Sequence, residues 1–183
     1  MKLLLSTAAF KGWTVGVGDA ERAFLQTLLP EGDPPIYVWP PKETGLDKGT
    51  VWKLRKALPG LKGAPQIWGS HASQTLIAKH GLQQSKRDEC LYYSQDLIML
   101  RHLDDFLAIG PRGRLEHLFK DMEQSLAVRG VELLTKVGQQ IQFLGRVLNK
   151  TANGYSIGCS QKLIDQIIES ENLSGGKGAQ LPG

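Results

Sequence analysis

The sequence has few cysteines, and their positions exclude two common classes of small protein. Only Cys90 and Cys159 are present, and they form no CxxC pair. A disulfide scaffold needs an even, closely spaced set of cysteines, so we expect two reduced thiols in a protein that stays inside a cell. The four histidines also lack the spacing of zinc ligands.

Long hydrophobic runs are missing as well. The apolar stretch after Lys2 is too short for a signal peptide, because Lys11 interrupts it. No other run approaches the length of about 20 apolar residues that a membrane-spanning helix needs. We therefore expect no membrane partner.

Neither sign of charge dominates the composition. The 183 residues include 22 basic and 18 acidic side chains, a net charge of +4. A chain of this length can build a single domain with a substantial core. The small basic excess suits an anionic partner such as nucleic acid but does not establish one, because basic clusters are also typical of an ordinary solvated surface.

The most informative stretch runs from Leu97 to Gly110. Two apolar runs of strand length flank the adjacent carboxylates Asp104 and Asp105, a pattern that predicts a β-hairpin. Two neighbouring anions repel each other unless a cation lies between them, and carboxylate oxygens suit Mg²⁺. The alternative is a solvated turn, since Asp is common in turns.

A third carboxylate, Asp19, follows a predicted strand from Trp13 to Gly18 and precedes a stretch of helical propensity from Ala20 to Leu29. A carboxylate at the end of a strand can enter an active site. Alternatively, Asp19 is the N-cap of the helix that follows it.

The remaining pattern predicts an α+β protein, an antiparallel sheet with helices packed on one face. Helices are expected at 3–10, 66–80, 114–128 (ended by Gly130) and 161–170, and strands at 36–39, 51–55, 91–93, 141–148 and 155–159.

Three motifs occur in the order typical of one family. Asp19-Ala20-Glu21-Arg22-Ala23-Phe24-Leu25, the Lys53–Pro65 segment with Trp68, and His102-Leu103-Asp104-Asp105 resemble the catalytic motifs of copia-type (Pseudoviridae-like) LTR-retrotransposon reverse transcriptases. Gln142-Phe143-Leu144-Gly145 and Ser160-Gln161 extend the resemblance downstream. It implies that residues 1–173 form a partial polymerase palm with a ferredoxin-like (RRM-like) core, fingers and thumb largely missing, and that 174–183 form a glycine-rich tail.

The resemblance also implies an activity and a site. Asp19, Asp104 and Asp105, with the Ala20 carbonyl, would hold two Mg²⁺ ions (or Mn²⁺) for nucleotidyl transfer to a primer 3′-hydroxyl. The implied partners are an RNA template, a DNA primer, dNTP, and the integrase and ribonuclease H regions of the same Pol polyprotein, in the cytoplasm, a virus-like particle or the nucleus. The implied nucleotide contacts are Ala23 and Phe24, and the nucleic-acid contacts are Lys53, Gly60, Lys62, Pro65 and His102.

Several positions depart from the family pattern. His102 replaces a tyrosine, Pro59 an aromatic residue, and Gly69 a tyrosine. Phe24 could equally be a core aromatic, and the lysines ordinary surface charges. Two other functions therefore stay open: an inactive retroelement remnant that folds and at most binds nucleic acid, and a small ferredoxin-like RNA-binding module. The second fits less well, because the Leu97–Gly110 hairpin offers acids and aliphatic residues instead of base-stacking aromatics.

Overall fold

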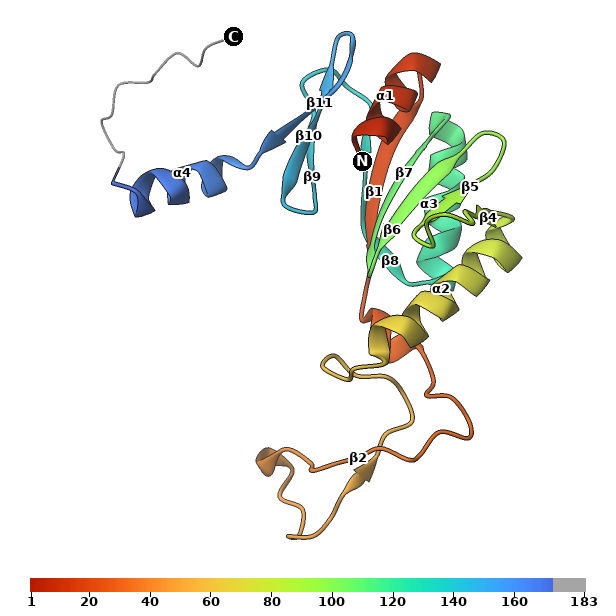
Figure 1. The fold of residues 1–183 in the computed structure, drawn as a ribbon, viewed down its shortest axis with the longest axis vertical. Helices are drawn as coiled ribbons and strands as arrows, with labels where there is room; N and C mark the ends of the chain where they lie inside the picture. The colour runs from red at the N-terminus through yellow and green to blue at the C-terminus, as the bar shows by residue number, and fades with distance from the viewer. Residues whose placement is uncertain (173–183) are drawn as a thin grey trace.

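A six-stranded antiparallel sheet forms the centre of the protein (Figure 1). The structure is a computed structural model that describes residues 1–172, so the predicted 174–183 tail lies outside the described residues. The strand order is β4-β5-β6-β7-β1-β8. The strands are β1 (Thr14–Ala20), β4 (Gln83–Gln84), β5 (Leu91–Tyr93), β6 (Ile98–His102), β7 (Asp105–Gly110) and β8 (Val128–Leu134).

Strand β7 is apolar at every position after its first because both faces of the sheet are covered. Phe106 and Ala108 belong to a core on one face, and Leu107 and Ile109 belong to a second core on the other. Alternate side chains of a strand point to opposite faces, so a continuous apolar run is what a doubly covered strand requires.

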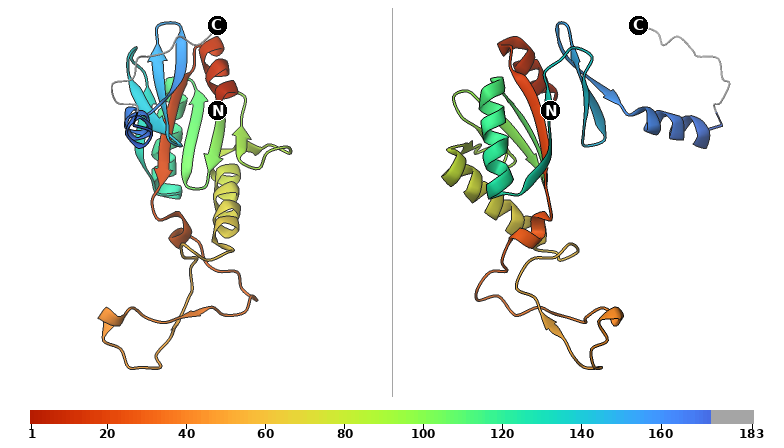
Figure 2. Two further views of the ribbon diagram at one scale, coloured as in Figure 1. Left: turned by 60° about the vertical axis from the view of Figure 1, so that its left-hand side comes forward. Right: turned by 180° about the vertical axis from the view of Figure 1, so that it is seen from behind.

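Two helices, α2 (Ala64–His80) and α3 (Arg112–Ser125), lie along one face of this sheet (Figure 2). Their buried apolar side chains meet those of β6 and β7 in one cluster. The α2 members are Trp68, Ala72 and Leu76, and the α3 members are Leu115, Leu118, Phe119 and Met122. This packing confirms the predicted α+β class, with an antiparallel sheet and helices on one face.

The opposite face is covered by α1 (Lys2–Lys11) and by a three-stranded antiparallel sheet of order β11-β10-β9. Its strands are β9 (Gln140–Phe143), β10 (Arg146–Thr151) and β11 (Gly154–Cys159). The Tyr155 hydroxyl on β11 donates a hydrogen bond of 2.7 Å to the Trp13 carbonyl, which ties this small sheet to the start of β1. The next helix, α4 (Gln161–Ser170), extends away from the body (Figure 1).

Glycines in β1 allow α3 to approach the sheet closely. A Cβ atom on Gly18 would lie 2.7 Å from Val128 Cγ1 and 3.2 Å from Phe119 Cε1, and one on Gly16 would lie 2.8 Å from Phe119 Cε2. The Phe119 ring therefore occupies the space that side chains at these two positions would need. The alternation of Val and Gly in β1 is explained by this contact.

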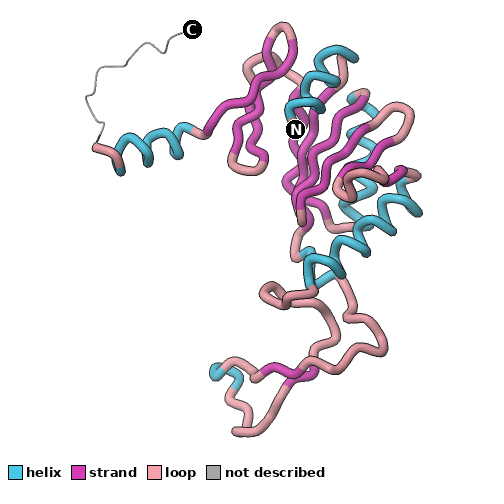
Figure 3. Tube along the Cα trace, in the orientation of Figure 1, coloured by secondary structure: helices cyan, strands magenta, loops and turns pink. Residues whose placement is uncertain are grey.

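Between β1 and α2 the chain leaves the sheet in a long excursion that is mostly loop (Figure 3). It contains two short 3₁₀ helices, η1 (Ala23–Gln26) and η2 (Lys42–Thr44), and a two-stranded ribbon of β2 (Tyr37–Val38) and β3 (Trp52–Lys53). In the part of the chain that the structure describes, no helix is both long and apolar enough to cross a lipid bilayer.

Two predictions around β1 are wrong. The helix expected over Ala20–Leu29 is only the four-residue η1, because the chain turns at Arg22 (φ 51°) and becomes extended again at Thr27. Asp19 is not a helix N-cap: it belongs to β1, and Arg22 occupies the N-cap position of η1.

The end of the third predicted helix is also wrong. Helix α3 ends at Ser125, and Gly130, expected as the helix stop, lies inside β8. The predicted strand 141–148 is divided into β9 and β10 by a turn at Leu144 (φ 49°) and Gly145 (φ 71°). The predicted hairpin that turns just before Gly154 is confirmed, and β10 and β11 are its two strands. The predicted helix from Gln161 to Ser170 is also confirmed.

Candidate active site

The three predicted acids lie together at one end of the central sheet. Asp19 on β1 is the cross-strand partner of Asp105 on β7. The Ala20 amide donates a hydrogen bond of 2.9 Å to the Asp104 carbonyl, which attaches the β6–β7 turn to the end of β1. The fold thus joins positions 84 and 86 apart in the sequence through backbone pairing.

The turn that carries Asp104 is unusually shaped. Leu103 adopts a left-handed conformation, with φ 54°, although it is not glycine. This conformation lets the chain reverse over two residues, so that His102 and Asp105 face each other as a cross-strand pair. The exposed His102 imidazole is therefore held next to the acid cluster.

Burial and mutual repulsion raise the pKa values of two of the acids. For Asp19, partial burial is the largest cause, and the charges of Asp104, Asp105 and Glu21 add to it. For Asp105, burial again comes first and the Asp104 charge second, while a protonated His102 would lower the pKa. No arginine or lysine is among the groups that shift these two pKa values, so the site is a concentration of negative charge.

The donor chemistry of the cluster fits a divalent cation. Carboxylate oxygens are hard ligands of the kind Mg²⁺ prefers, and a cation would relieve the repulsion that raises these pKa values. Within residues 1–172, however, no three His, Cys, Asp or Glu side chains form a preassembled metal-binding group. The backbone therefore brings the acids together without assembling such a group among these residues.

The residues that follow Asp19 in the sequence pack against the core of the central sheet. Ala20 and Ala23 are buried, with side chains in the core against α2 and α3. Phe24, in η1, is partly buried and packs against the same core. Its predicted place beneath a nucleotide sugar stays a prediction, since the structure gives it a core contact in addition to a partly exposed surface.

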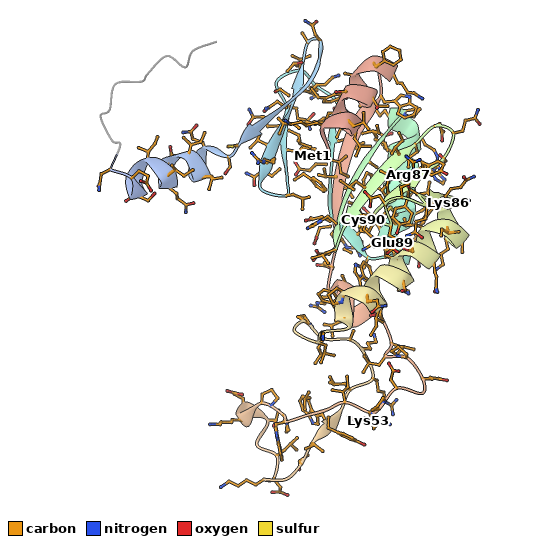
Figure 4. All side chains as sticks on the ribbon, viewed as in Figure 1. Met1, Lys53, Lys86, Arg87, Glu89 and Cys90 are labelled. Atoms are coloured by element: carbon orange, nitrogen blue, oxygen red, sulfur yellow. The ribbon has the colours of Figure 1, made fainter. Side chains whose placement is uncertain are left out.

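The predicted nucleic-acid residues are more dispersed. Lys53 lies in the projecting ribbon, away from the sheet and the acids (Figure 4). Gly60, Lys62 and Pro65 are exposed around the start of α2, and Gly60 has φ 92°, a conformation that side chains disfavour. The structure therefore gathers the three acids and His102 but leaves Lys53 on a separate element.

A cleft of about 640 Å³ connects these dispersed segments. It lies between the loop after η1, strand β3 and the first turn of α2, and Lys53 lines it together with Leu61, Gly63 and Ala64. Its wall is largely apolar and also includes the cationic Lys53 and Arg55 and the anionic Glu31 and Asp33. The second motif segment and the loop after η1 therefore border one concave surface.

Two residues near the acids were not singled out from the sequence for the roles the structure gives them. The Trp68 indole on α2 donates a hydrogen bond of 2.8 Å to the Leu103 carbonyl, and Arg101 on β6 is buried beside the same turn. The sequence does carry one signal for Arg101, because a charged residue there interrupts an otherwise apolar strand. Glu21 has no role among the sequence-based predictions, yet its charge contributes to the raised pKa of Asp19.

A sheet of this topology, with two helices on one face and an acid cluster at the end of a hairpin, defines a polymerase palm-like fragment. Among solved structures, apo telomerase from Candida tropicalis, truncated from its C-terminal domain, superposes with a TM-score of 0.53 over 86% of this chain and 38% of that one, at 11% identity. The similarity at this identity concerns the fold.

The sequence comparisons identify the family. Residues 1–183 match the family described as reverse transcriptase (RNA-dependent DNA polymerase), and the chain belongs to it. It is 28% identical to the retrovirus-related Pol polyprotein from transposon TNT 1-94 of Nicotiana tabacum, over 100% of this chain and 14% of the relative. It is also 28% identical to the Pol polyprotein from transposon RE1 of Arabidopsis thaliana, over 95% of this chain and 12% of the relative. The chain thus spans a small part of the length of these proteins.

Proposed function

We propose that this chain is the palm region of an RNA-directed DNA polymerase from a copia-type retrotransposon, with residues 1–173 as a partial palm domain. The reaction is transfer of a nucleotide from dNTP to the 3′-hydroxyl of a DNA primer paired with an RNA template. The observation that carries the proposal is the cross-strand pair of Asp19 and Asp105, with Asp104 attached to β1 through the Ala20 amide.

Asp19, Asp104 and Asp105 would hold two Mg²⁺ ions, or Mn²⁺ in their place, with the Ala20 carbonyl as a further ligand. Bound there, the ions supply activation of the primer hydroxyl and charge stabilisation on the attacking and leaving oxygens. The chain's own contribution is to keep three mutually repelling carboxylates in register. Phosphoryl transfer depends mainly on such positioning and on charge neutralisation.

The substrates would occupy surfaces on both sides of the acids. Ala23 and Phe24 follow Asp19 closely in the sequence. The sugar of the incoming nucleotide would rest on these two residues. The lysines would contact phosphates of template or primer without reading sequence. The proposed nucleic-acid contacts are Lys53, Gly60, Lys62, Pro65 and His102, of which Lys53 lines the cleft before α2.

The names of the relatives support a place for this chain within a larger polyprotein. Both plant relatives are Pol polyproteins, of which this chain matches 14% and 12%. We infer that integrase and ribonuclease H regions of such a polyprotein are partners of this chain, and that it acts inside the cell. The free state of Cys90 and Cys159 agrees with a reducing compartment.

A second function has one observation in its favour. The acid side chains of the described residues form no preassembled metal group. A retroelement remnant that folds and binds nucleic acid without polymerising would keep the backbone pairing and lose the convergence of the carboxylates.

Primer extension on a homopolymeric RNA template, with Mg²⁺ or Mn²⁺, separates the two functions. We expect incorporation by the wild type and by the control Asp47→Asn, whose carboxylate is exposed in a remote loop, and none by Asp105→Asn. If no protein incorporates nucleotide while all three bind RNA in a salt-dependent manner, the polymerase proposal is wrong and the remnant is supported.

A further inference from the structure

Arg101 is a buried cation without an ion-pair partner among the described residues. It lies on β6, its residue is only 7% exposed, and its Nε atom has no hydrogen-bond partner. Burying a guanidinium is costly unless its charge and donors are satisfied. A residue of this kind, two positions before the acid-bearing turn, calls for an explanation beyond filling the core.

Space for this side chain is provided by a glycine of α2. A Cβ atom on Gly69 would lie 3.4 Å from Nη2 and 3.8 Å from Nη1 of Arg101. The guanidinium therefore lies directly against the helix, next to Trp68. A methyl group at position 69 would already be in van der Waals contact with it.

Arg101 and Trp68 donate to the same acceptor. Arg101 Nη1 lies 3.4 Å from the Leu103 carbonyl oxygen, and Trp68 Nε1 lies 2.8 Å from it. A carbonyl oxygen has two lone pairs and can accept both donors. The short indole bond is the stronger of the two, and the longer one gains strength from the charge of its donor.

The acceptor belongs to the strained residue of the turn. Leu103 has φ 54°, which is unfavourable for a residue with a branched side chain, and that side chain is 43% exposed. Burial of the leucine therefore contributes little to holding this conformation. The two donors on its carbonyl can hold it, and the next carbonyl, that of Asp104, is bound by the Ala20 amide.

We propose that Arg101 and Trp68 are positioning residues that clamp the Leu103 carbonyl and so fix the turn bearing Asp104 and Asp105 opposite Asp19. The clamp holds the acid turn in place while no cation offsets the repulsion among its carboxylates. A turn ordered beforehand loses less conformational entropy when a divalent ion binds. This inference rests on the proposed function, since the ion is the one that the acids would hold.

The test compares Arg101→Met with Met99→Ala. Both residues are buried on β6 and two positions apart, so they point to the same face, but of the two side chains only that of Arg101 donates a hydrogen bond to the turn. Mn²⁺ affinity is measured by electron paramagnetic resonance titration of free Mn²⁺. We expect Arg101→Met to weaken binding about tenfold, as loss of an outer-shell partner does. Met99→Ala should stay close to wild type.

A second readout needs no metal. Hydrogen exchange of the Ala20 amide reports whether the turn stays attached to β1, and we expect faster exchange in Arg101→Met than in Met99→Ala. Equal Mn²⁺ affinity and equal exchange in the two variants would overturn the clamp. If wild type binds no more Mn²⁺ than Asp104→Asn, the proposed function fails instead, and the exchange comparison still decides the clamp.

Discussion

Asp19 and Asp105 are direct partners across β1 and β7, so their relative position is set by the register of one strand pair. Alternate residues of both strands belong to different cores, and a slip of one residue would exchange the two faces. The cores therefore fix the register, and the register places the acids. Stability and site geometry are coupled through the same two strands.

Replacing Asp19 by Asn should stabilise the metal-free protein. Its pKa is raised in the fold, so the native state loses stability as the pH rises from the ordinary value of 3.8 through the raised value, and at pH 7 the full cost is present. We expect a gain in free energy of unfolding of about 1 kcal/mol or less, because the Asp19 carboxylate is only partly buried and solvent screens its charge. Urea denaturation in a chelator measures it.

The control for that measurement is Asp47→Asn, in the projecting loop. It should leave the free energy of unfolding unchanged. A destabilised Asp19→Asn variant would contradict the repulsion described for the acid cluster.

Gly18→Ala should destabilise the protein, because its Cβ would lie 2.7 Å from Val128 Cγ1 and 3.2 Å from Phe119 Cε1. Overpacking of this kind costs about 1–3 kcal/mol. The matched variant is Gly158→Ala on β11, where no atom lies within 4 Å of the added carbon. Thermal unfolding of the two variants compares them, and equal melting temperatures would refute the tight α3–β1 contact.

His80 should make the protein less stable in mild acid. Its Nε2 lies 2.9 Å from Ser125 Oγ, and because that hydroxyl donates to the Asp121 carbonyl, the histidine is the donor in its bond to Ser125. Burial lowers the His80 pKa most, Arg114, Lys79 and His117 lower it further, and Asp121 opposes them.

The direction of the pH effect follows from the lowered pKa. The unfolded chain binds a proton near the ordinary value of 6.5 while the native state resists it, so stability is complete above that pH and falls below it. His80→Asn should flatten the decline in unfolding free energy between about pH 7.5 and pH 5. The pKa of His71 is also lowered, mainly by burial, so a residual slope remains. An unchanged slope would show that His80 is not the group responsible.

Lys53→Gln and Lys62→Gln should each weaken binding to single-stranded RNA and reduce its salt dependence. One lost phosphate contact lowers the slope of log affinity against log salt by about 0.7. Fluorescence anisotropy at several salt concentrations measures this slope. Lys120→Gln on the outer surface of α3 removes the same charge and serves as the control. Equal slopes for all three variants would mean that the two lysines contact no phosphate.

Sequence reasoning succeeded where local pattern and long-range structure agree. The hairpin with Asp104 and Asp105 was recognised because its two strands are apolar and the interruption is short and charged. Helix α4 has the bounds predicted from the sequence, and the structure shows Ser160 as its side-chain N-cap, accepting from the Leu163 amide. The expected approach of Asp19 to the hairpin needed the family motifs, and the strand pairing agrees with it.

It failed where a left-handed residue changes the course of the chain. Arg22, Ala127 and Leu144 all have φ near 50°, and each lies where an expected helix or strand stops early. Arginine, alanine and leucine, unlike glycine or asparagine, give no sequence signal for this conformation. Strand β8 was missed for that reason, since the chain reverses at Ala127 and Gly130 then resembles a helix stop.

Phe119 gives α3 an influence on the acids that it does not touch. Its ring fills the gaps left by two glycines in the strand that carries Asp19, so a helix residue 100 positions after that carboxylate sets how flat and how straight the strand can be. Smaller residues at 119 would leave β1 unsupported just behind its carboxylate. Substitutions in the hydrophobic core would therefore disable a retroelement protein of this kind even when every acid in its motifs is retained.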